Sequence, residues 1–210
     1  MSEEPTTAAE LFDAIGAKYE EAFGHRPVVE AAVRELIDVL PPSARVLDVG
    51  SGTGRPAAAE LAAAGHRVTG IDVSAEMVRI AREQVPGAEF VQADVREWQT
   101  APGTWDAVCA FFSFVQLSRT ETEQVLGRIA GWLAPGGRFA LVTVPGDIED
   151  VPIEFLGHSI RVTSFPADAL TDRVRAAGLE VTGTRMERFE PGKPGAEPEE
   201  HLLISARKPG

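Results

Sequence analysis

Apolar segments alternate with segments of helical period along most of the chain. The apolar segments that predict strands lie at 46–49, 66–72, 88–93, 105–112, 133–144, 179–184 and 201–207. Helical spacing of apolar residues is found at 55–65, 75–84, 119–133 and 167–178. Regular alternation of strand and helix predicts a parallel sheet with helices packed on its faces. Ligands of such sheets bind outside the carboxyl ends of the strands, so the residues there are the first candidates for a site.

The first strand runs directly into a glycine-rich turn with the spacing Gly50-x-Gly52-x-Gly54. Glycines at such a turn let a ligand approach the backbone without interference from Cβ atoms. A dinucleotide fingerprint has the spacing G-x-G-x-x-G, whereas here Arg55 stands where its last glycine would be. Asp48 lies two positions before the first glycine, where a carboxylate would repel a pyrophosphate and orient an ammonium group. The turn therefore predicts a nucleotide-like ligand that carries an amine.

Two further strands end in an acid. Asp72 follows the glycines by about twenty residues, the distance at which a carboxylate accepts both hydroxyls of a ribose. Asp94 ends the third strand, a position at which an NAD enzyme has no general need for an acid. Because strand ends of a parallel sheet share one edge, both carboxylates are expected near the glycine turn.

These features together resemble the class I S-adenosylmethionine (SAM)-dependent methyltransferases. Asp48 with the G-x-G-x-G turn resembles the first motif of that family, and residues 133–137, Leu-Ala-Pro-Gly-Gly, resemble its L-x-P-G-G turn. The resemblance covers roughly residues 10–208. It implies an α/β fold: a Rossmann-like, doubly wound, seven-stranded sheet, mostly parallel with one antiparallel strand, with helices on both faces. It also implies a single methyltransferase domain over residues 1–210.

The resemblance implies SAM as cofactor and S-adenosylhomocysteine as product. The glycine turn and Asp48 would cradle the methionine part, Asp72 would hold the ribose, and Asp94 with the next backbone N–H would hold the adenine. The end of the fourth strand would face the methionine part. The expected cofactor-binding residues are Asp48, Gly50, Ser51, Gly52, Gly54, Asp72, Val73, Asp94, Val95 and Phe111.

Two segments are available to cover the crevice. Residues 1–8 are expected to form a flexible tail, and residues 9–40 a helical segment with an apolar stripe that covers the cofactor crevice. The region 145–166, about twenty residues long, is too short for an inserted cap domain. This predicts an acceptor pocket that is fairly open, or one closed by the N-terminal helix and a second subunit. Residues 190–200 are expected to form a Pro/Gly-rich hairpin loop between the last two strands.

Methyl transfer from a sulfonium asks little of side chains, since alignment of the acceptor supplies much of the rate. The catalytic residue is therefore unknown, and the weak candidates for a base are Tyr19, His25 and His158. Related sequences often carry a histidine near Gln116, and glutamine cannot act as a base at neutral pH.

Composition narrows the choice of partners. A formal net charge of −12 over 210 residues is a poor match for nucleic acid, whose affinity comes largely from Lys and Arg. No apolar run is long enough to span a membrane, and a signal-peptide pattern is lacking. One cysteine excludes an internal disulfide, and no His/Cys cluster has metal spacing. We expect a cytoplasmic protein with no metal, no membrane or nucleic-acid partner, and possibly a homodimer.

The sequence thus predicts a SAM-dependent methyltransferase that acts on a small-molecule acceptor, with O- or N-methylation favoured. Three alternatives stay open. The first is a SAM-binding protein of the same fold with a non-methylating, cyclase-like or regulatory role. The second is an NAD-type oxidoreductase, disfavoured by the glycine spacing and by Asp94. The third is a protein-interaction module that has lost its ligand, disfavoured by the complete set of acids.

Overall fold

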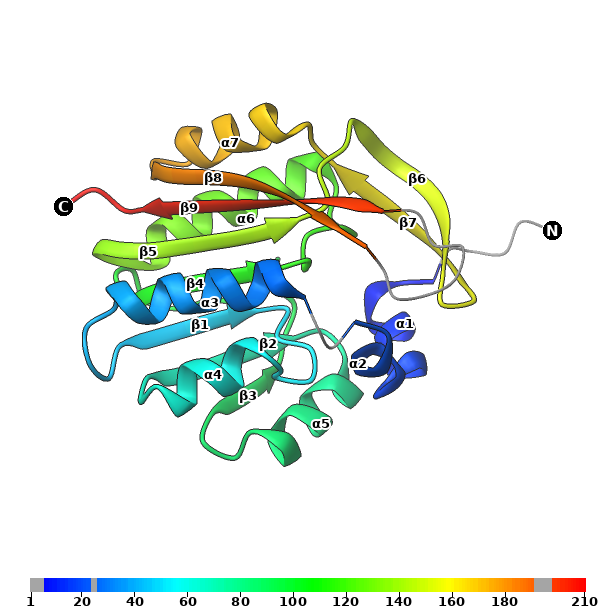
Figure 1. Ribbon diagram of the computed structural model, residues 1–210, viewed down its shortest axis with the longest axis horizontal. Coiled ribbons are helices and arrows are strands. Elements are labelled where there is room, and N and C mark those ends of the chain that lie inside the picture. Colours follow the sequence, from blue (N-terminus) through cyan, green and yellow to red (C-terminus); the bar gives the residue numbers. More distant parts are fainter. Residues whose placement is uncertain (1–5, 24–25, 191–197) are drawn as a thin grey trace.

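The computed structural model describes residues 6–23, 26–190 and 198–210 (Figure 1). The helices are α1 (Ala8–Ile15), α2 (Lys18–Phe23), α3 (Pro27–Val39), α4 (Ala57–Ala63), α5 (Ala75–Gln84), α6 (Arg119–Trp132) and α7 (Ala167–Ala176). The strands are β1 (Arg45–Val49), β2 (Arg67–Asp72), β3 (Glu89–Gln92), β4 (Trp105–Phe111), β5 (Leu133–Thr143), β6 (Ile148–Phe155), β7 (His158–Ser164), β8 (Glu180–Phe189) and β9 (Glu199–Arg207).

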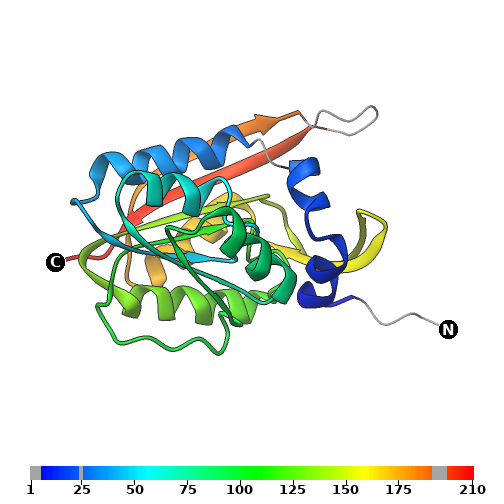
Figure 2. The same ribbon diagram turned by 90° about the horizontal axis from the view of Figure 1, so that it is seen from below.

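One seven-stranded sheet forms the centre of the molecule, in the order β3-β2-β1-β4-β5-β9-β8. Strands β1 to β5 run parallel, and β9 is antiparallel to both of its neighbours. Helices α3, α4 and α5 pack on one face of this sheet, and α6 and α7 pack on the other (Figure 2). The predicted Rossmann-like, doubly wound sheet with one antiparallel strand is confirmed.

Local sequence signals explain where the crossover helices begin. Ser74 caps α5, where its side chain accepts a hydrogen bond from the N–H of Met77, and the helix covers the predicted residues 75–84. Ser118 and Glu121 form a capping box at the start of α6, each side chain bonded to the other residue's backbone N–H. Both helices therefore begin immediately after a loop at the carboxyl edge of the sheet.

The segment that resembles L-x-P-G-G forms the start of β5, directly after α6. Helix α6 ends at Trp132, before the proline, and Leu133 already pairs with Trp105 of β4. The register of β4 and β5 then shifts before Ala107 pairs with Arg138. A Cβ atom on Gly137 would lie 2.8 Å from the carbonyl oxygen of Ala134, so this glycine is required by an irregular stretch of β5.

The region between β5 and α7 contains structure that the sequence patterns did not predict. Strands β6 and β7 pair as a separate two-stranded antiparallel hairpin. Ile160 of β7 is buried against Leu11 and Ile15 of α1 and against Met77 of α5. The hairpin and the N-terminal helices thus lie together beside the ends of β1 and β4 (Figure 1).

The N-terminal segment differs from expectation at both ends. Residues 6–8 do not belong to a flexible tail, because Thr7 and Glu10 form a capping box and Ala8 begins α1. The N–H of Thr6 also donates to the carbonyl of Ser159 in β7, at 3.1 Å. At the other end, α3 does not cover the edge of the sheet. Its buried apolar residues pack on the same face of the sheet as α4, against β5 and β9. Within 9–40, the residues beside the crevice come from α1 and α2.

Some expectations fall on residues that the structure does not describe. Residues 1–5 of the expected tail, His25, and residues 191–197 of the Pro/Gly-rich loop lie outside the described residues. The predicted loop is too long at its end, because Glu199 and Glu200 already pair with β8. In the part of the chain that is described, every helix is too short or too polar to cross a membrane.

Candidate functional site

A cavity of about 310 Å³ lies at the carboxyl edge of the parallel strands. The loops after β1, β2, β3 and β4 form one side of it, and α1, α2 and β7 supply the other. Seven of the expected cofactor-binding residues line it, namely Gly50, Gly52, Asp72, Val73, Asp94, Val95 and Phe111. The structure thus brings together residues that lie far apart in the sequence, as expected of strand ends in a parallel sheet.

The glycine turn is held by backbone bonds to the neighbouring strand. The N–H groups of Gly50 and Ser51 both donate to the carbonyl of Ile71, at 2.8 and 3.0 Å. Gly50 has φ +69°, and a Cβ atom placed on it would lie 2.3 Å from the Cβ atom of Ser113. Glycine is therefore required both by the left-handed backbone and by the close approach of the loop after β4.

Asp72 ties the glycine turn to the end of β2. Its carboxylate accepts hydrogen bonds from the N–H of Gly52 and from the N–H of Ser74, both at 2.9 Å. The residue is only 8% exposed, and burial raises its pKa while the two N–H donors act in the opposite direction. The carboxylate still borders the cavity, where its remaining lone pairs are available to a ligand.

Asp94 is held by a neighbour that the sequence reasoning did not consider. Arg96 bonds both carboxylate oxygens of Asp94, the shortest contact being 2.6 Å, and also reaches Glu121 at 3.0 Å. Burial raises the pKa of Asp94, but the bonds from Arg96 outweigh it and leave the pKa below its ordinary value. Arg96 thereby connects the end of β3 to the capping box of α6, next to the loop after β4.

Three of the expected cofactor-binding residues do not line the cavity: Asp48, Ser51 and Gly54. Asp48 is 2% exposed in the interior of β1, where the Cys109 thiol donates to its carboxylate at 3.4 Å. Burial raises the pKa of Asp48 to about 7. Gly54 faces the core, since a Cβ atom there would lie 2.9 Å from the ring of Phe90. Asp48 is thus enclosed within its strand and Gly54 faces the core, which sequence spacing alone does not reveal.

The aromatic segment after β4 divides between core and cavity. Phe114 is buried in the core, whereas Phe111 and Phe112 border the cavity. Phe112 has φ +56°, a backbone conformation that is costly for a bulky residue and that tends to persist at functional sites. The guanidinium of Arg26 lies 4.2 Å from the centroid of the Phe112 ring and 5.5 Å from that of Tyr19. This cation was not among the residues singled out from sequence.

Two polar atoms at the cavity wall are buried without a hydrogen-bond partner among the described residues. They are the hydroxyl oxygen of Ser113 and the side-chain carbonyl oxygen of Gln116. A buried polar atom left unpaired costs about 1–3 kcal/mol, so native proteins retain few of them. Their position beside the glycine turn fits a polar ligand that supplies the missing partners.

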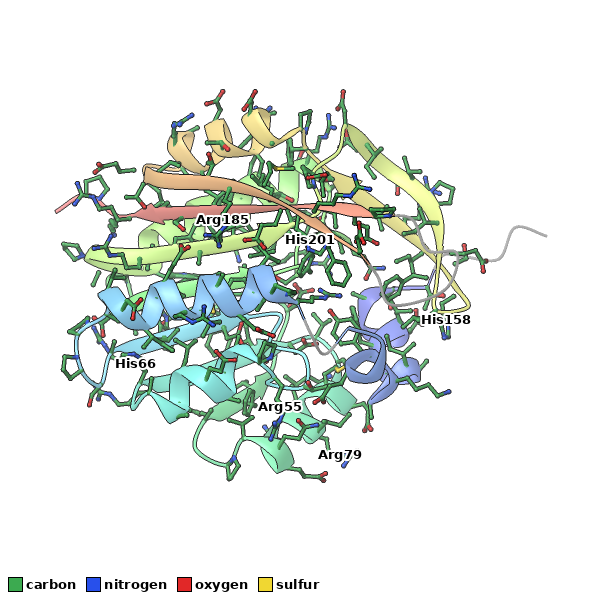
Figure 3. All side chains as sticks on the ribbon, in the orientation of Figure 1. Arg55, His66, Arg79, His158, Arg185 and His201 are labelled. Carbon is green, nitrogen blue, oxygen red and sulfur yellow. The ribbon has the colours of Figure 1, made fainter. Side chains whose placement is uncertain are left out.

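The weak candidates for a base are placed differently from one another. Tyr19 lines the cavity and packs edge-on against Phe12, with 5.5 Å between ring centroids. His158 begins β7, outside the cavity lining, at the far end of the hairpin in Figure 3. His201 is 2% exposed, is stacked on Phe189, and does not line the cavity. Within the described ranges, no group of His, Cys, Asp and Glu has a metal-binding arrangement.

Sequence reasoning missed three cations near the cavity: Arg26, Arg96 and Arg161. Arg96 and Arg161 line it, and Arg26 lies against two aromatic rings that do. The Asp-x-Arg spacing of Asp94 and Arg96 was a signal available in the sequence. Arg161 carried no such signal, because the hairpin that presents it was not predicted.

Comparisons with known proteins agree with this architecture. A family described as "Methyltransferase domain" matches residues 46–137. Trans-aconitate 2-methyltransferase of Paracidovorax citrulli is 42% identical over 113 residues, which cover 51% of this chain and 42% of that relative. The chain spans about half or less of the length of several such curated relatives.

Solved structures share the fold across nearly the whole chain. The 1,6-didemethyltoxoflavin-N1-methyltransferase of Burkholderia thailandensis, solved with its substrate and S-adenosylhomocysteine, has a TM-score of 0.69. It is 23% identical, and the match covers 99% of this chain and 93% of that one. The [4+2]-cyclase SpnF has a TM-score of 0.73 at 22% identity, with 98% of both chains covered. At these identities the likeness concerns the fold.

Proposed function

Since this chain belongs to the class I SAM-dependent methyltransferase family, we propose that it transfers the methyl group of SAM to an oxygen or nitrogen atom of a small molecule. The observation that carries the proposal is that one cavity is lined on one side by the glycine turn and two strand-end acids, and on the other side by residues of α1, α2 and β7. The first group of residues suits a cofactor, and the second suits an acceptor brought against it.

The residues present fit SAM. Asp72 offers carboxylate lone pairs to the ribose hydroxyls, while its bonds to Gly52 and Ser74 keep the turn in place. Asp94 and the N–H of Val95 would hold the adenine edge. The exposed backbone of Gly50 and Gly52 would contact the methionine part. Asp48 would act through the turn, because its carboxylate lies beneath and not beside the cavity.

The chemistry requires alignment more than proton transfer. SAM, when bound, supplies a methyl group already activated on a sulfonium. Phe112 and Tyr19 would exclude water from the reacting atoms and present aromatic faces, which attract cations. The protein's main contribution would then be to hold the acceptor atom in line with the methyl group.

The acceptor is proposed to be a small molecule and not a nucleic acid. The cavity is about 310 Å³, and the chain carries a formal net charge of −12, which opposes phosphate backbones. The similar proteins include one named for methylation of trans-aconitate, a small acid, and one named for N1-methylation of 1,6-didemethyltoxoflavin. With a single cysteine and therefore no internal disulfide to form, the chain suits the reducing cytoplasm, which we propose as its location.

Calorimetric titration with SAM, S-adenosylhomocysteine and NAD tests the cofactor first. Saturable binding of both adenosyl-sulfur ligands, with none for NAD, is the expected result. Binding of NAD alone would overturn the proposal. Transfer of labelled methyl from SAM to any member of a metabolite panel then separates methylation from a non-methylating role of the same fold.

A further inference from the structure

The edge of strand β7 that does not pair with β6 borders the cavity. Strand β6 occupies one edge of β7, with Pro152 opposite Arg161. On the other edge, the carbonyl of Ser159 accepts from the N–H of Thr6 and the N–H of Thr163 donates to the carbonyl of Val115. Backbone groups of alternate residues in a strand point to the same side, so the N–H and carbonyl of Arg161 lie on this edge between the two anchoring bonds. Arg161 itself lines the cavity. Proline opposite Arg161 agrees with this, because no ladder bond is needed there.

Arg161 places a positive charge at the cavity wall, and a ligand can replace its present partner, Asp150. Its guanidinium is bound by the carboxylate and the backbone carbonyl of Asp150 in β6. Asp150 is 68% exposed and Arg161 is 40% exposed, and such surface pairs contribute little to stability. Arg96, the other cation of the lining, is already held between Asp94 and Glu121. Arg161 is therefore the cation of the described lining that an anionic ligand can recruit at small cost.

The described lining offers no base suited to deprotonate an acceptor. Its titratable side chains are Tyr19, Asp72, Asp94, Arg96 and Arg161, with no histidine among them. Asp72 and Asp94 are assigned to the cofactor, and the Tyr19 ring packs against Phe12 as part of the wall. An acceptor that needs no deprotonation at pH 7 suits such a wall. A carboxylate meets this condition, because carboxylic acids ionise near pH ~4.

We propose that the acceptor is a small carboxylic acid that Arg161 binds and that is methylated on a carboxylate oxygen. The inference rests on the proposed function and specifies its substrate class. The carboxylate oxygen forms a bond to the methyl carbon as the carbon–sulfur bond breaks, and that electron pair stays on sulfur. The products are a methyl ester and S-adenosylhomocysteine, and no proton is released. In an acid with one carboxylate, Arg161 pairs with one carboxylate oxygen while the other oxygen attacks the methyl carbon. In an acid with two carboxylates, Arg161 binds one carboxylate and the other is methylated.

The neighbours of Arg161 restrict the acid further. Phe12, Tyr19 and Val115 supply apolar wall beside it, and the hydroxyl of Ser113 and the amide of Gln116 supply polar groups without partners. A flat acid with an unsaturated or aromatic body is complementary to such a wall, since aromatic side chains pack well against planar groups.

The test uses the full chain with SAM labelled in its methyl group. Probes are benzoate, cinnamate and fumarate, each beside its amide: benzamide, cinnamamide and fumaramide. We expect label in the acids and not in the amides, and release of that label as methanol on mild alkali, which esters undergo and N- or C-methyl products do not. No labelled ester from any acid, or label only in alkali-stable products, would overturn the inference.

Variants assign the role to Arg161. We expect Arg161→Gln to lower kcat/KM for the best acid roughly ten-fold or more, the scale of a lost charge-assisted hydrogen bond, and Arg161→Lys to restore part of it. Calorimetric affinity for S-adenosylhomocysteine should stay within about two-fold. Arg175→Gln is the matched control, since Arg175 pairs with Asp172 on the surface and does not line the cavity. Asp150→Asn should raise the affinity of the S-adenosylhomocysteine complex for the same acid, because it removes the competing carboxylate.

The outcomes separate this inference from the proposed function. If wild-type protein binds S-adenosylhomocysteine but Arg161→Gln loses that binding, Arg161 belongs to the cofactor and the inference fails. Equal kcat/KM for wild type and Arg161→Gln would also reject it, while the methyltransferase proposal would stand. Absence of cofactor binding by the wild-type chain would reject both.

Discussion

The carboxylate of Asp72 accepts a hydrogen bond from the backbone N–H of Gly52, with 2.9 Å between oxygen and nitrogen. One acid at the end of β2 therefore fixes the turn after β1 while it also borders the cavity. The same carboxylate accepts from Ser74 at the start of α5. The local order of the turn consequently depends on one side chain, and under the proposed function cofactor binding would depend on it as well.

Loss of the Asp72 carboxylate should weaken cofactor binding strongly. For Asp72→Ala we expect the Kd of S-adenosylhomocysteine to rise by about 100-fold or more, the scale of two lost hydrogen bonds to a charged group. Calorimetric titration measures it. Glu123→Gln is the control, since Glu123 is an exposed partner of Arg173 at 3.2 Å and lies away from the cavity. Equal affinities of the two variants would refute the assignment of Asp72 to the ribose.

Asp48 should make the free protein less stable as the pH rises. Its pKa is about 7 in the folded protein and about 3.9 in an unfolded chain, so the folded state binds the extra proton between these values. Its contribution to the free energy of unfolding therefore falls from about pH 4 to about pH 7 and is constant above that. Urea unfolding of wild type and Asp48→Asn should agree at pH 4 and differ at pH 8, with the variant more stable by up to about 4 kcal/mol. The same difference at both pH values would contradict this.

Gly50 should tolerate a side chain less well than Gly65. Both have positive φ, +69° and +88°, so alanine at either position is strained by about 1 kcal/mol. Only at Gly50 would the new Cβ meet another atom, the Cβ of Ser113 at 2.3 Å, whereas nothing lies within 4 Å at Gly65. We expect Gly50→Ala to lower the free energy of unfolding by about 2 kcal/mol more than Gly65→Ala does.

A second substitution identifies the clash at Gly50 as the cause. Adding Ser113→Gly to Gly50→Ala removes the Cβ atom that the alanine would meet. Denaturant midpoints of the single and double variants should therefore show partial recovery. No recovery would mean that backbone strain alone accounts for the loss.

Tyr19 should shape the cavity wall and should not act as a general base. Its ring borders the cavity and packs edge-on against Phe12. With an identified acceptor, Tyr19→Phe should keep kcat within about three-fold of wild type, because only the hydroxyl is removed. Tyr19→Ala should lower kcat/KM about ten-fold or more, because it opens the cavity to water. His158→Ala is the companion variant, expected to leave both constants unchanged because His158 lies outside the lining. A large loss in Tyr19→Phe would instead assign proton transfer to the phenol.

Short-range sequence patterns were enough to predict the sheet and the side of the cavity that its strand ends form. The glycine turn, Ser74 as the cap of α5, and the acids Asp72 and Asp94 are each specified by neighbours within a few residues, so spacing placed them at one edge. Spacing did not reveal that Asp48, Ser51 and Gly54 lie outside the cavity lining, since the directions of their side chains or Cα–H bonds depend on the packing around β1 and its turn.

By itself, the sequence determined an alternating α/β sheet with a glycine turn and acids at its carboxyl edge, because periodicity and glycine positions act locally. Only the tertiary structure decided what faces that edge. Hairpin β6–β7 packs on α1 through Ile160 and Leu11, which are far apart in the chain, and this packing places Arg161 at the cavity. Arg26 likewise meets Phe112 only after α3 docks on the sheet. Contacts of this kind follow from packing between distant segments, so no local pattern encodes them.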